Sequence, residues 1–432
     1  MAGDLVDRLT AGEWRDPEDG ERVQVAIRSI VIERSLAGSE GALVGALGLG
    51  RRLAVVSDPA TDAVLGARVR RALDGIATVR QIALGDHPHS DQDTVDRIRA
   101  ATTASDALIA VGSGTINDLC KYAAHCDGKP YAVFATAPSM NGYTSANAAI
   151  TVDGHKKSLA AAVPRGVFVE LDTLAKAPAR MIRAGLGDSL CRPTAQADWL
   201  LSHRPHGTPY RRAPFDLLTQ DEPRLLLEPE AVVAGAPDAI GSLARTLILS
   251  GLGMTICGGS YPASQGEHLI SHYIDMFAPP DRAPFFHGEQ VAVATVTMAR
   301  LQEQLLDGPA PRLLPSTATP AALRTWMGDA AGDACWAEFQ PKALDAAAAA
   351  AASARIAADW PGHRAAIRPV TLPAATIETA LRRAGVPTRP QEIGLSDAFY
   401  QAAVARARYL RNRYGFLDLA GDTGLLGMRA AA

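Results

Sequence analysis

Several features that would place this 432-residue chain in other classes of protein are missing from it. Its five cysteines are odd in number and form no CxxC pair, so we expect neither a disulfide framework nor a zinc ribbon, and the compartment is expected to be reducing. The 43 Lys and Arg residues are balanced by 46 Asp and Glu, so no basic field is present to attract nucleic acid or anionic lipid. No run of about 18 uncharged apolar residues suggests a membrane span, and the polar, acidic start does not match a secretory signal. We therefore expect a cytoplasmic protein with no nucleic-acid or membrane partner.

The overall composition is typical of a globular protein. Hydrophobic residues make up 47% of the chain and charged residues 21%, which is enough apolar surface to build a packed core. The length favours two domains, since domains usually contain roughly 100–200 residues.

The two halves of the chain carry different periodic patterns. Short β-rich runs alternate with helical patterns from Val23 to about Leu174, which is typical of βα units around a mostly parallel sheet. The predicted strands are RRLAVVSD, ALIAVGSG, YAVFATAPS and GVFVELD. Beyond Pro178 strand signals nearly vanish, and the Ala-rich stretch 343–358 predicts a surface helix. We predict an α/β domain over residues 1–177 and an all-α domain over residues 178–432.

A glycine-rich turn, GSGTIND (112–118), follows the predicted strand ALIAV and leads into a helical pattern. Backbone N–H groups at such a turn favour an anion, and Gly112 and Gly114 allow a phosphate to approach. On its own this motif is weak, because a tight βα turn needs glycine for its dihedral angles alone.

Two further loops leave predicted strands at the same edge of the sheet. Asp58 closes the strand LAVVS and is placed either to accept hydrogen bonds from an adenosine ribose or simply to cap the next helix before Pro59. In the first interpretation its charge would repel a 2′-phosphate and favour NAD over NADP. The loop TAPSMNGYTS (136–145) gathers hydroxyls and an amide, and ligands of open α/β sheets bind where strands end.

A second set of chemical groups lies further along the chain. Asp188 in GLGDSL, His268 with His272 in GEHLISH, and His287 in FFHGEQ offer one carboxylate and several imidazoles. His268 and His272 are four residues apart, so a helix would present both rings on one face. Such a set suits zinc, iron or nickel with positions left for substrate oxygen, although a lone helical histidine is more often structural. We interpret the other histidines as solvent-facing: His87, His89, His125, His155, His203, His206 and His363. His155 is the exception to watch, because HKKS brings two lysines near the predicted crevice, and a phosphate-bearing substrate would need such cations, although a charge pair in a hairpin is usually just solvated.

The order of the motifs GSGTIND, TAPSMNGYTS, HKKS, PARMIRAGLGDSL, SQGEHLISH and FHGEQV resembles the glycerol-1-phosphate dehydrogenase family, within the iron-containing alcohol dehydrogenase and dehydroquinate synthase superfamily. The resemblance runs from about Arg22 to about Leu306. It implies a Rossmann-like amino-terminal domain, a helical carboxyl-terminal domain of the dehydroquinate synthase-like type, and an active site served by both. It implies metal ligands at Asp188, His268 and His287, and a substrate-contacting histidine at His272.

The nucleotide contacts implied by the resemblance fall on three segments. They are Gly112, Ser113, Gly114, Thr115 and Ile116, then Thr136 and Ser139, and lastly Ser145; we add Asn117 and Asp118 of the same turn, and Asp58. Many relatives have a substrate-contacting aspartate where this chain has Asn141. An amide cannot accept a proton and carries no charge, so this position bears on substrate identity.

We therefore predict a metal-dependent, NAD(P)-linked dehydrogenase that interconverts dihydroxyacetone phosphate and sn-glycerol 1-phosphate. We expect NAD, with NADP as the alternative, one divalent metal, zinc before nickel or iron, and a homo-oligomer of two or more chains. The first rival is a dehydrogenase of another polyol or polyol phosphate. A sugar phosphate cyclase is a second rival, but the lysine that such enzymes carry three residues after a glutamate ligand corresponds to Cys191 here, next to Arg192. A non-catalytic nucleotide-binding protein is the third.

Overall fold

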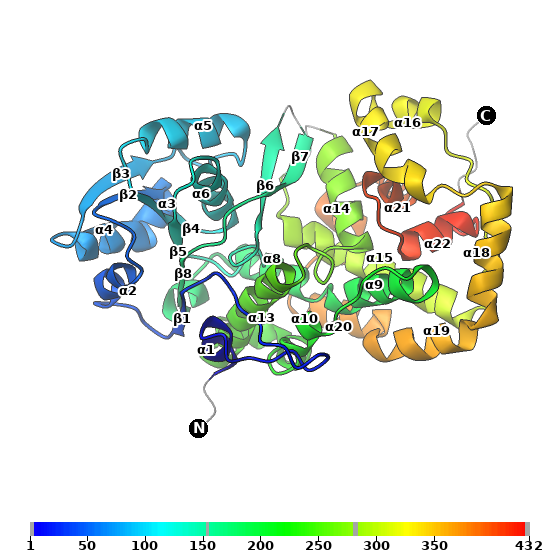
Figure 1. Cartoon of the computed structure of the whole chain (residues 1–432), viewed down its shortest axis with the longest axis horizontal. Helices are drawn as coiled ribbons and strands as arrows, with labels where there is room; N and C mark the ends of the chain where they lie inside the picture. The colour runs from blue at the N-terminus through cyan, green and yellow to red at the C-terminus, as the bar shows by residue number, and fades with distance from the viewer. Residues whose placement is uncertain (1–3, 153–154, 280–283, 428–432) are drawn as a thin grey trace. The chain divides into compact units, whose positions relative to one another are not determined.

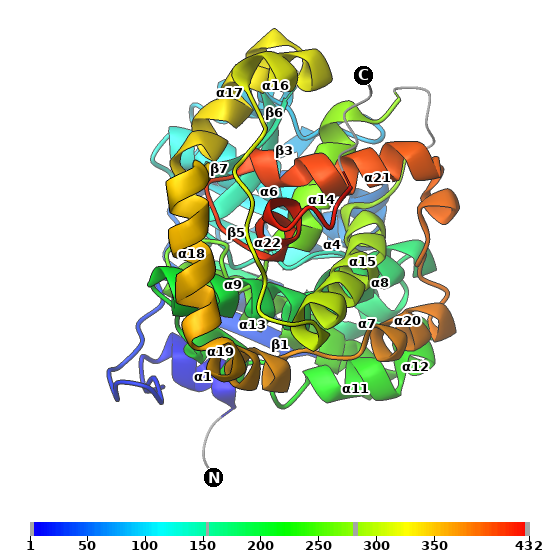
Figure 2. The same ribbon diagram turned by 90° about the vertical axis from the view of Figure 1, so that its right-hand side faces the viewer.

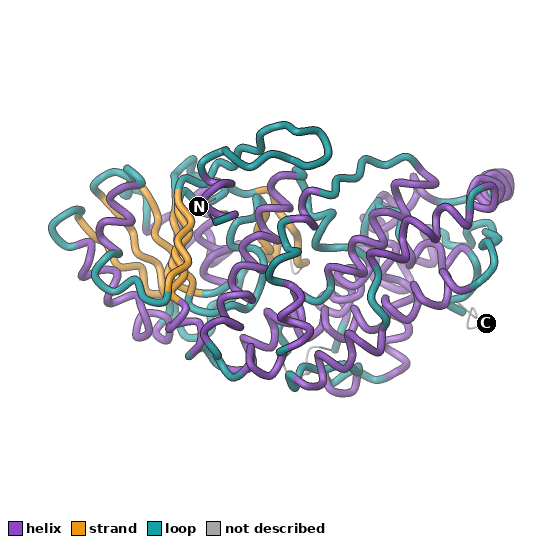
Figure 3. Tube along the Cα trace, turned by 90° about the horizontal axis from the view of Figure 1, so that it is seen from below, coloured by secondary structure: helices purple, strands orange, loops and turns teal. Residues whose placement is uncertain are grey.

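The computed structural model describes residues 4–152, 155–279 and 284–427, and these divide into two compact units. Unit 1 comprises Met1–Ser189 and Arg211–Ser260, and unit 2 comprises Leu190–Tyr210 and Tyr261–Ala432. Figure 3 shows that the strands belong to one part of the chain, and in the described residues all of them lie in unit 1.

Unit 1 is built on a six-stranded sheet in which every pair of neighbours is parallel. In spatial order its strands are β1 (Ser29–Glu33), β8 (Gly166–Glu170), β5 (Tyr131–Ala135), β4 (Ala107–Gly112), β2 (Arg52–Ser57) and β3 (Thr78–Ala83). The strands β4, β5 and β8 are buried at every residue. Strands covered on both faces read as continuous apolar runs, which is why these segments were visible in the sequence.

Helices cover both faces of this sheet (Figure 1). One face carries α2 (Glu40–Ala46) and α4 (Ala67–Leu73), and the other carries α5 (Gln92–Ala101) and α6 (Gly114–Cys126). The core beneath the first pair includes Val55 and Ile109, with the rings of Phe134 and Phe168 4.8 Å apart. The antiparallel hairpin of β6 (Asn147–Val152) and β7 (His155–Ala160) packs against α6.

The rest of unit 1 is helical and is centred on α13 (Pro237–Ile256). Its other members are α1 (Leu5–Thr10), α7 (Leu171–Ala175), α8 (Ala179–Ser189), α10 (Ala213–Asp216), α11 (Glu222–Leu227) and α12 (Pro229–Val233). The short helix α3 (Pro59–Thr61) belongs instead to the sheet region, where it follows β2. By length and composition α13 is apolar enough to cross a membrane, and it is the single helix in the described residues that meets this test. Most of it is buried, with α7, α8, α10, α11 and α12 packed around it, so it has the burial of a core helix.

Unit 2 consists of helices (Figure 2). They are α9 (Arg192–His206), α14 (Gly266–Phe277), α15 (His287–Asp307), α16 (Pro320–Met327), α17 (Asp329–Phe339), α18 (Ala346–Ala358), α19 (Trp360–Ile367), α20 (Ala374–Arg383), α21 (Asp397–Arg406), the short 3-10 turn η5 (Ala407–Leu410) and α22 (Phe416–Asp422). The pair α14 and α15 packs side by side, with α21 against α14 and α22 against α15. Ile270, Ile274, Val293 and Phe416 form part of one apolar core there.

The secondary-structure elements predicted from the sequence match the structure more closely than the predicted division of these elements into two domains. The four predicted strands are β2, β4, β5 and β8, and the Ala-rich stretch forms α18, which buries Ala349, Ala352 and Ile356 on one face. The predicted boundary after residue 177 coincides with the end of the strand-rich region, whereas unit 1 also includes α8 and α10 to α13. These helices belong there because α13 packs on α7 and α8.

One expectation about histidines is wrong. We predict that His363 faces solvent, but it is buried, because it lies on α19, which packs against α9, and it accepts a hydrogen bond from Arg204 Nε at 3.3 Å. The side chain of His155 lies outside the described residues.

Candidate active site

Three histidines gather on the facing sides of α14 and α15. His268 and His272 are one turn apart on α14, and His287 is the first residue of α15. The ring centroids of His268 and His287 are 5.1 Å apart, and His272 lies 5.9 Å from His287 and 6.4 Å from His268. The predicted i, i+4 pair is therefore joined by His287 inside unit 2. His268 is buried, while His272 and His287 are half-buried.

A buried carboxylate fixes the ring of His268. The Nδ1 atom of His268 lies 2.9 Å from Oε1 of Glu267, whose side chain is fully buried. Burial would raise the pKa of Glu267, but hydrogen bonds from His268 and from the backbone N–H of Gln265 hold it below its ordinary value. An ionised Glu267 can only accept, so Nδ1 of His268 donates this hydrogen bond. Carboxylate–imidazole pairs of this kind orient metal-binding histidines.

A chain of hydrogen bonds also orients the ring of His287 through its Nδ1 atom. Gln290 donates from Nε2 to Asp275 at 3.0 Å, so its Oε1 accepts from the Ser271 hydroxyl, also at 3.0 Å. Ser271 has one hydroxyl proton, so towards His287 Nδ1, 3.1 Å away, it accepts. His287 therefore also donates from Nδ1. Histidine is a common ligand of divalent metals, and hydrogen bonds to Nδ1 orient metal-binding rings, so the two histidines of unit 2 suit a divalent metal.

Asp188 is held in unit 1, at the end of α8. It is buried, and its Oδ2 accepts the backbone N–H of Asn141 at 3.0 Å. A Cβ on Gly185, one turn earlier, would overlap the carbonyl oxygen of Pro138. Gly185 thus allows α8 to lie directly on the loop 136–145.

The loop 136–145 is also anchored to α13. A Cβ on Gly251 would overlap Oγ1 of Thr144 and the carbonyl oxygen of Asn141. Thr144 donates from Oγ1 to the carbonyl of Ile248 at 2.7 Å, and Asn141 donates from Nδ2 to Ser250 at 3.3 Å. Asn141 is therefore held by two helices, and one of these carries Asp188.

The glycine-rich turn lies where β4 ends and α6 begins. Gly112 is the last residue of β4 and Ser113 the N-cap of α6, with no side-chain cap bond. A Cβ on Gly112 would overlap Ile116, and one on Gly114 would lie 3.0 Å from Met140. Because no side chain caps the helix, the N–H groups of Gly114 and Thr115 are suited to an anion.

The remaining residues of this motif point inward. Asn117 is fully buried and donates to Asp118 at 3.1 Å; within the described residues its Oδ1 has no partner. Asp118 accepts the backbone N–H of Ala149 in the hairpin at 3.0 Å. These two side chains therefore brace the turn, whatever its backbone binds.

Other predicted nucleotide residues have defined structural partners. Asp58 caps α3, because its Oδ1 accepts from the backbone N–H of Thr61 at 2.7 Å and from its hydroxyl at 2.9 Å. The capping interpretation is thus confirmed, and the ribose contact stays a prediction. Thr136 is buried and donates its backbone N–H to Gly112, and Ser139 is half-buried.

Ser145 contacts Lys121, a residue that the sequence did not indicate as functional. Its hydroxyl lies 3.3 Å from Nζ of Lys121, which also donates to the carbonyls of Gly142 and Asn147 and is 3.8 Å from Asp118. Lys121 is fully buried on α6, and burial lowers its pKa to about 8. One lysine thus ties the end of the loop 136–145 to the hairpin.

A second group of possible metal ligands lies in unit 2. Cys191, Glu267 and His268 each offer an atom within 4.8 Å of the others. Glu267 is already engaged by His268, by Gln265 and by the hydroxyl of Thr194 at 3.2 Å. We therefore interpret Glu267 as a support for His268. Sequence reasoning missed Glu267, Ser271 and Gln290, although the acid next to His268 in GEHLISH was a signal that could have found the first.

Comparisons with known proteins give the fold and the family of this chain. A family profile described as iron-containing alcohol dehydrogenase matches residues 31–178. Among solved structures, glycerol dehydrogenase from Schizosaccharomyces pombe aligns with a TM-score of 0.63 at 16% identity, covering 94% of this chain and 90% of that one. A probable glycerol dehydrogenase from Sinorhizobium meliloti aligns with a TM-score of 0.59 at 19% identity, covering 93% and 96%. At these identities the likeness establishes the fold, which is that of the iron-containing alcohol dehydrogenases.

Comparison with curated relatives identifies one family within the iron-containing alcohol dehydrogenases. The glycerol-1-phosphate dehydrogenase [NAD(P)+] of Bacillus licheniformis is 28% identical over 382 residues, which cover 87% of this chain and 84% of the relative. The enzyme of the same name from Pyrococcus horikoshii is 32% identical over 275 residues, covering 63% of this chain and 78% of the relative. The chain belongs to the glycerol-1-phosphate dehydrogenase family, and the resemblance drawn from its motifs is confirmed.

Proposed function

We propose that this protein is a metal-dependent, NAD(P)-linked dehydrogenase that interconverts dihydroxyacetone phosphate and sn-glycerol 1-phosphate. The observation that carries the proposal is the pair His268 and His287, whose rings are each oriented through Nδ1, by Glu267 at 2.9 Å and by Ser271 at 3.1 Å. In a member of this family, such a pair supports a working metal-dependent enzyme.

Asp188 completes the proposed ligand set with His268 and His287. Asp188 and His268 are buried and His287 is half-buried, so these groups are shielded from bulk water. Two imidazoles and one carboxylate suit zinc, which we propose ahead of nickel or iron. A divalent metal held there would act as a Lewis acid towards the substrate carbonyl.

The chain's own residues supply binding and the proton. The N-terminus of α6 and Gly112 are proposed to hold the pyrophosphate of NAD, with Asp58 at the ribose, so that the nicotinamide can exchange a hydride with the substrate. His272 is proposed to hydrogen-bond the reacting substrate oxygen and to deliver or receive its proton. Residues 1–177 would then serve the nucleotide and residues 178–432 the metal and the substrate.

Asn141 favours one rival function. Its amide lies where relatives carry an aspartate, and its backbone N–H is bonded to Asp188. A changed hydrogen-bonding group there would suit a different polyol or polyol phosphate. Parallel kinetics with paired phosphorylated and free polyols would separate this rival from the proposed reaction.

The central test measures metal content together with turnover. Purified protein is incubated with NADH, dihydroxyacetone phosphate and a panel of divalent metals, with a chelated control. Asp188→Ala, His268→Ala and His287→Ala are each expected to lose bound metal and turnover while NAD binding persists. His125→Ala, which removes an exposed histidine of α6, is the matched control. Normal metal content in all three variants would refute the proposed site.

Two further properties are proposed with the function. We expect a cytoplasmic location and a homo-oligomer of two or more chains. Light scattering of the purified protein measures the assembly directly, and a monomer at working concentration would contradict it.

A further inference from the structure

Arg411 makes direct contact with the histidine assigned to the substrate. It lies between η5 and α22, in a part of the chain beyond the motifs shared with relatives. Its NH2 group lies 3.2 Å from Nε2 of His272, and its NH1 group donates to the hydroxyl of Ser264 at 2.9 Å. Arginine has no acceptor, so Nε2 of His272 accepts this hydrogen bond. Arg411 therefore lies along the first turns of α14, the helix that also carries His268.

A second arginine lies beside it. Arg413 donates from NH1 to the backbone carbonyl of Ser264 at 3.1 Å, and its guanidinium lies 3.9 Å from the ring centroid of Tyr261. Both arginines thus attach to the short segment that precedes α14. The guanidinium groups of Arg411 and Arg413 therefore make the region next to His272 strongly positive.

In the described residues the charge of Arg411 is offset only in part, by Glu267 and Glu338. Within residues 4–152, 155–279 and 284–427, no carboxylate forms an ion pair with Arg411. Burial and the charge of Arg413 lower its pKa to about 10, and Glu267 and Glu338 oppose this shift only in part. A shielded cation without a paired anion is costly, and arginine is the residue of choice for binding phosphate.

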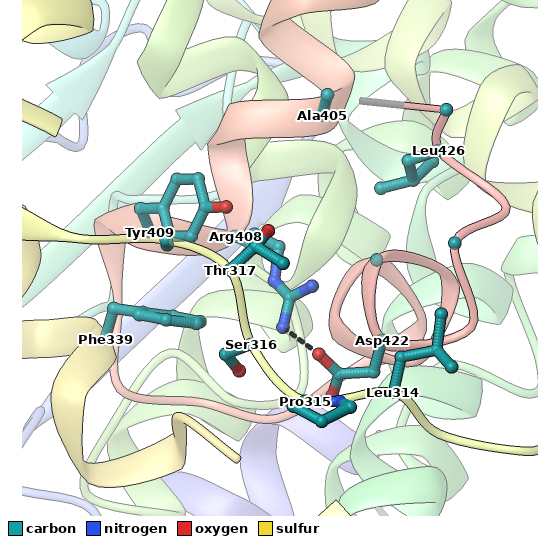
Figure 4. Close-up of a pocket in the computed structure, with 14 residues that line it drawn as sticks. Leu314, Pro315, Ser316, Thr317, Phe339, Ala405, Arg408, Tyr409, Asp422 and Leu426 are labelled. Atoms are coloured by element: carbon teal, nitrogen blue, oxygen red, sulfur yellow. Dashed lines mark hydrogen bonds and ion pairs between the residues drawn. The ribbon is translucent and has the colours of Figure 1, made fainter. Parts of the chain in front are cut away.

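Arg408, three residues before Arg411, differs from it because its charge is paired with carboxylates. It lines a cavity of about 310 Å³ with Phe339 and Tyr409 (Figure 4). There it donates to Asp422 at 2.6 Å and to Asp418 at 3.2 Å, so its charge is already balanced. That cavity therefore presents no unmatched cation, whereas the neighbourhood of Arg411 does.

We propose that Arg411, with Arg413 beside it, binds the phosphate group of the substrate and thereby selects a phosphorylated polyol over its free counterpart. This inference rests on the proposed function, because it takes His272 to face the substrate. A guanidinium has five N–H donors, and the contacts to Ser264 and His272 use two of them. The half-buried side chain retains donors and exposed surface for a phosphate oxygen.

The experiment compares two substrates in the metal-loaded enzyme. Arg411→Gln should lower kcat/KM for dihydroxyacetone phosphate by about 10- to 100-fold, the loss expected for a charged hydrogen bond. For free dihydroxyacetone the change should stay within about threefold, and Arg411→Lys should recover part of the loss, since the charge is kept. Arg406→Gln is the matched control, because Arg406 is a half-buried arginine that contacts Tyr273 and Trp326 instead of His272.

Other outcomes overturn the inference. An equal fall with both substrates would make Arg411 a positioning residue for His272, and no fall with the phosphorylated substrate would show that it does not contact phosphate. If the wild-type enzyme turns over neither substrate, the proposed function fails, and calorimetric titration with inorganic phosphate still tests this site. Binding by the wild type that weakens about tenfold or more in Arg411→Gln supports it. Equal binding, or none, refutes it.

Discussion

The Nδ1 atom of His268 lies 2.9 Å from Oε1 of Glu267, its fully buried neighbour in the chain. This contact sets the tautomer of His268, and the ionised carboxylate makes Nε2 a better donor to a metal. Glu267 also accepts the backbone N–H of Gln265, so it supports the start of α14 at the same time.

Replacing Glu267 by Gln should weaken metal binding by about 10- to 100-fold, because the amide keeps the shape of the side chain and removes its charge. Competition with a chromogenic chelator measures the affinity, and a melting curve of the metal-free protein reports any loss of fold. Glu303→Gln is the control, since Glu303 caps the backbone N–H of Ala374 away from the histidines. Equal affinity in wild type and Glu267→Gln would show that this carboxylate does not tune the metal.

Asp58 provides a prediction about the choice of cofactor. Serine can still cap α3 but carries no charge, so Asp58→Ser should narrow a preference for NADH over NADPH by about tenfold, equivalent to about 1.4 kcal/mol. The ratio of kcat/KM for the two cofactors measures this. A wild-type enzyme that already prefers NADPH would rule out the ribose role of Asp58.

The close approach of α8 to the loop 136–145 predicts a large effect of a single methyl group. Gly185→Ala would push against the carbonyl oxygen of Pro138, and we expect it to lower the free energy of unfolding by about 1–3 kcal/mol. It should also weaken metal binding, because Asp188 follows on the same helix. Urea unfolding measures the first effect. Gly85→Ala, at a glycine with open space around it, should change little, and equal stability of all three proteins would contradict the packing described here.

The buried lysine predicts a specific pH dependence. The pKa of Lys121 is lowered by burial from its ordinary value of 10.5 to about 8, so between these values the folded protein binds fewer protons than the unfolded chain. Stability should therefore rise with pH across this window, by up to about 3 kcal/mol. Lys121→Met should lack this component, which urea unfolding at several pH values would reveal. If the difference in the free energy of unfolding between the wild type and Lys121→Met does not change from pH 8 to pH 10, this prediction is wrong.

The sequence predicted the parts of the fold that local patterns encode. Apolar runs such as ALIAV indicated the buried strands because both of their faces are covered, and GEHLISH placed two histidines on one helix face. Contacts between distant segments leave no such pattern. Lys121 bonds to residues more than 20 positions away, and Arg411 reaches His272 across 139 positions, so only the folded chain shows them. Asp58 was ambiguous because a capping aspartate and a ribose-binding aspartate occupy the same place after a strand.

Asn141 is the position at which the family resemblance implies an aspartate, and Asn141→Asp tests what the amide does. The amide donates to Ser250 at 3.3 Å, and its backbone N–H is bonded to Asp188, so an aspartate would place a second carboxylate close to a proposed metal ligand. We expect kcat/KM for dihydroxyacetone phosphate to fall by about 10- to 100-fold, the cost of about 1–3 kcal/mol for one lost hydrogen bond and added repulsion. Ser250→Ala, which removes the partner of the amide and adds no charge, is the control and should have the smaller effect. A rise in Asn141→Asp would show that the reaction of the relatives is residual in this chain and that another polyol is its substrate. A change within about twofold in either direction would show that residue 141 does not touch the substrate, because a contact in the transition state is worth more than that.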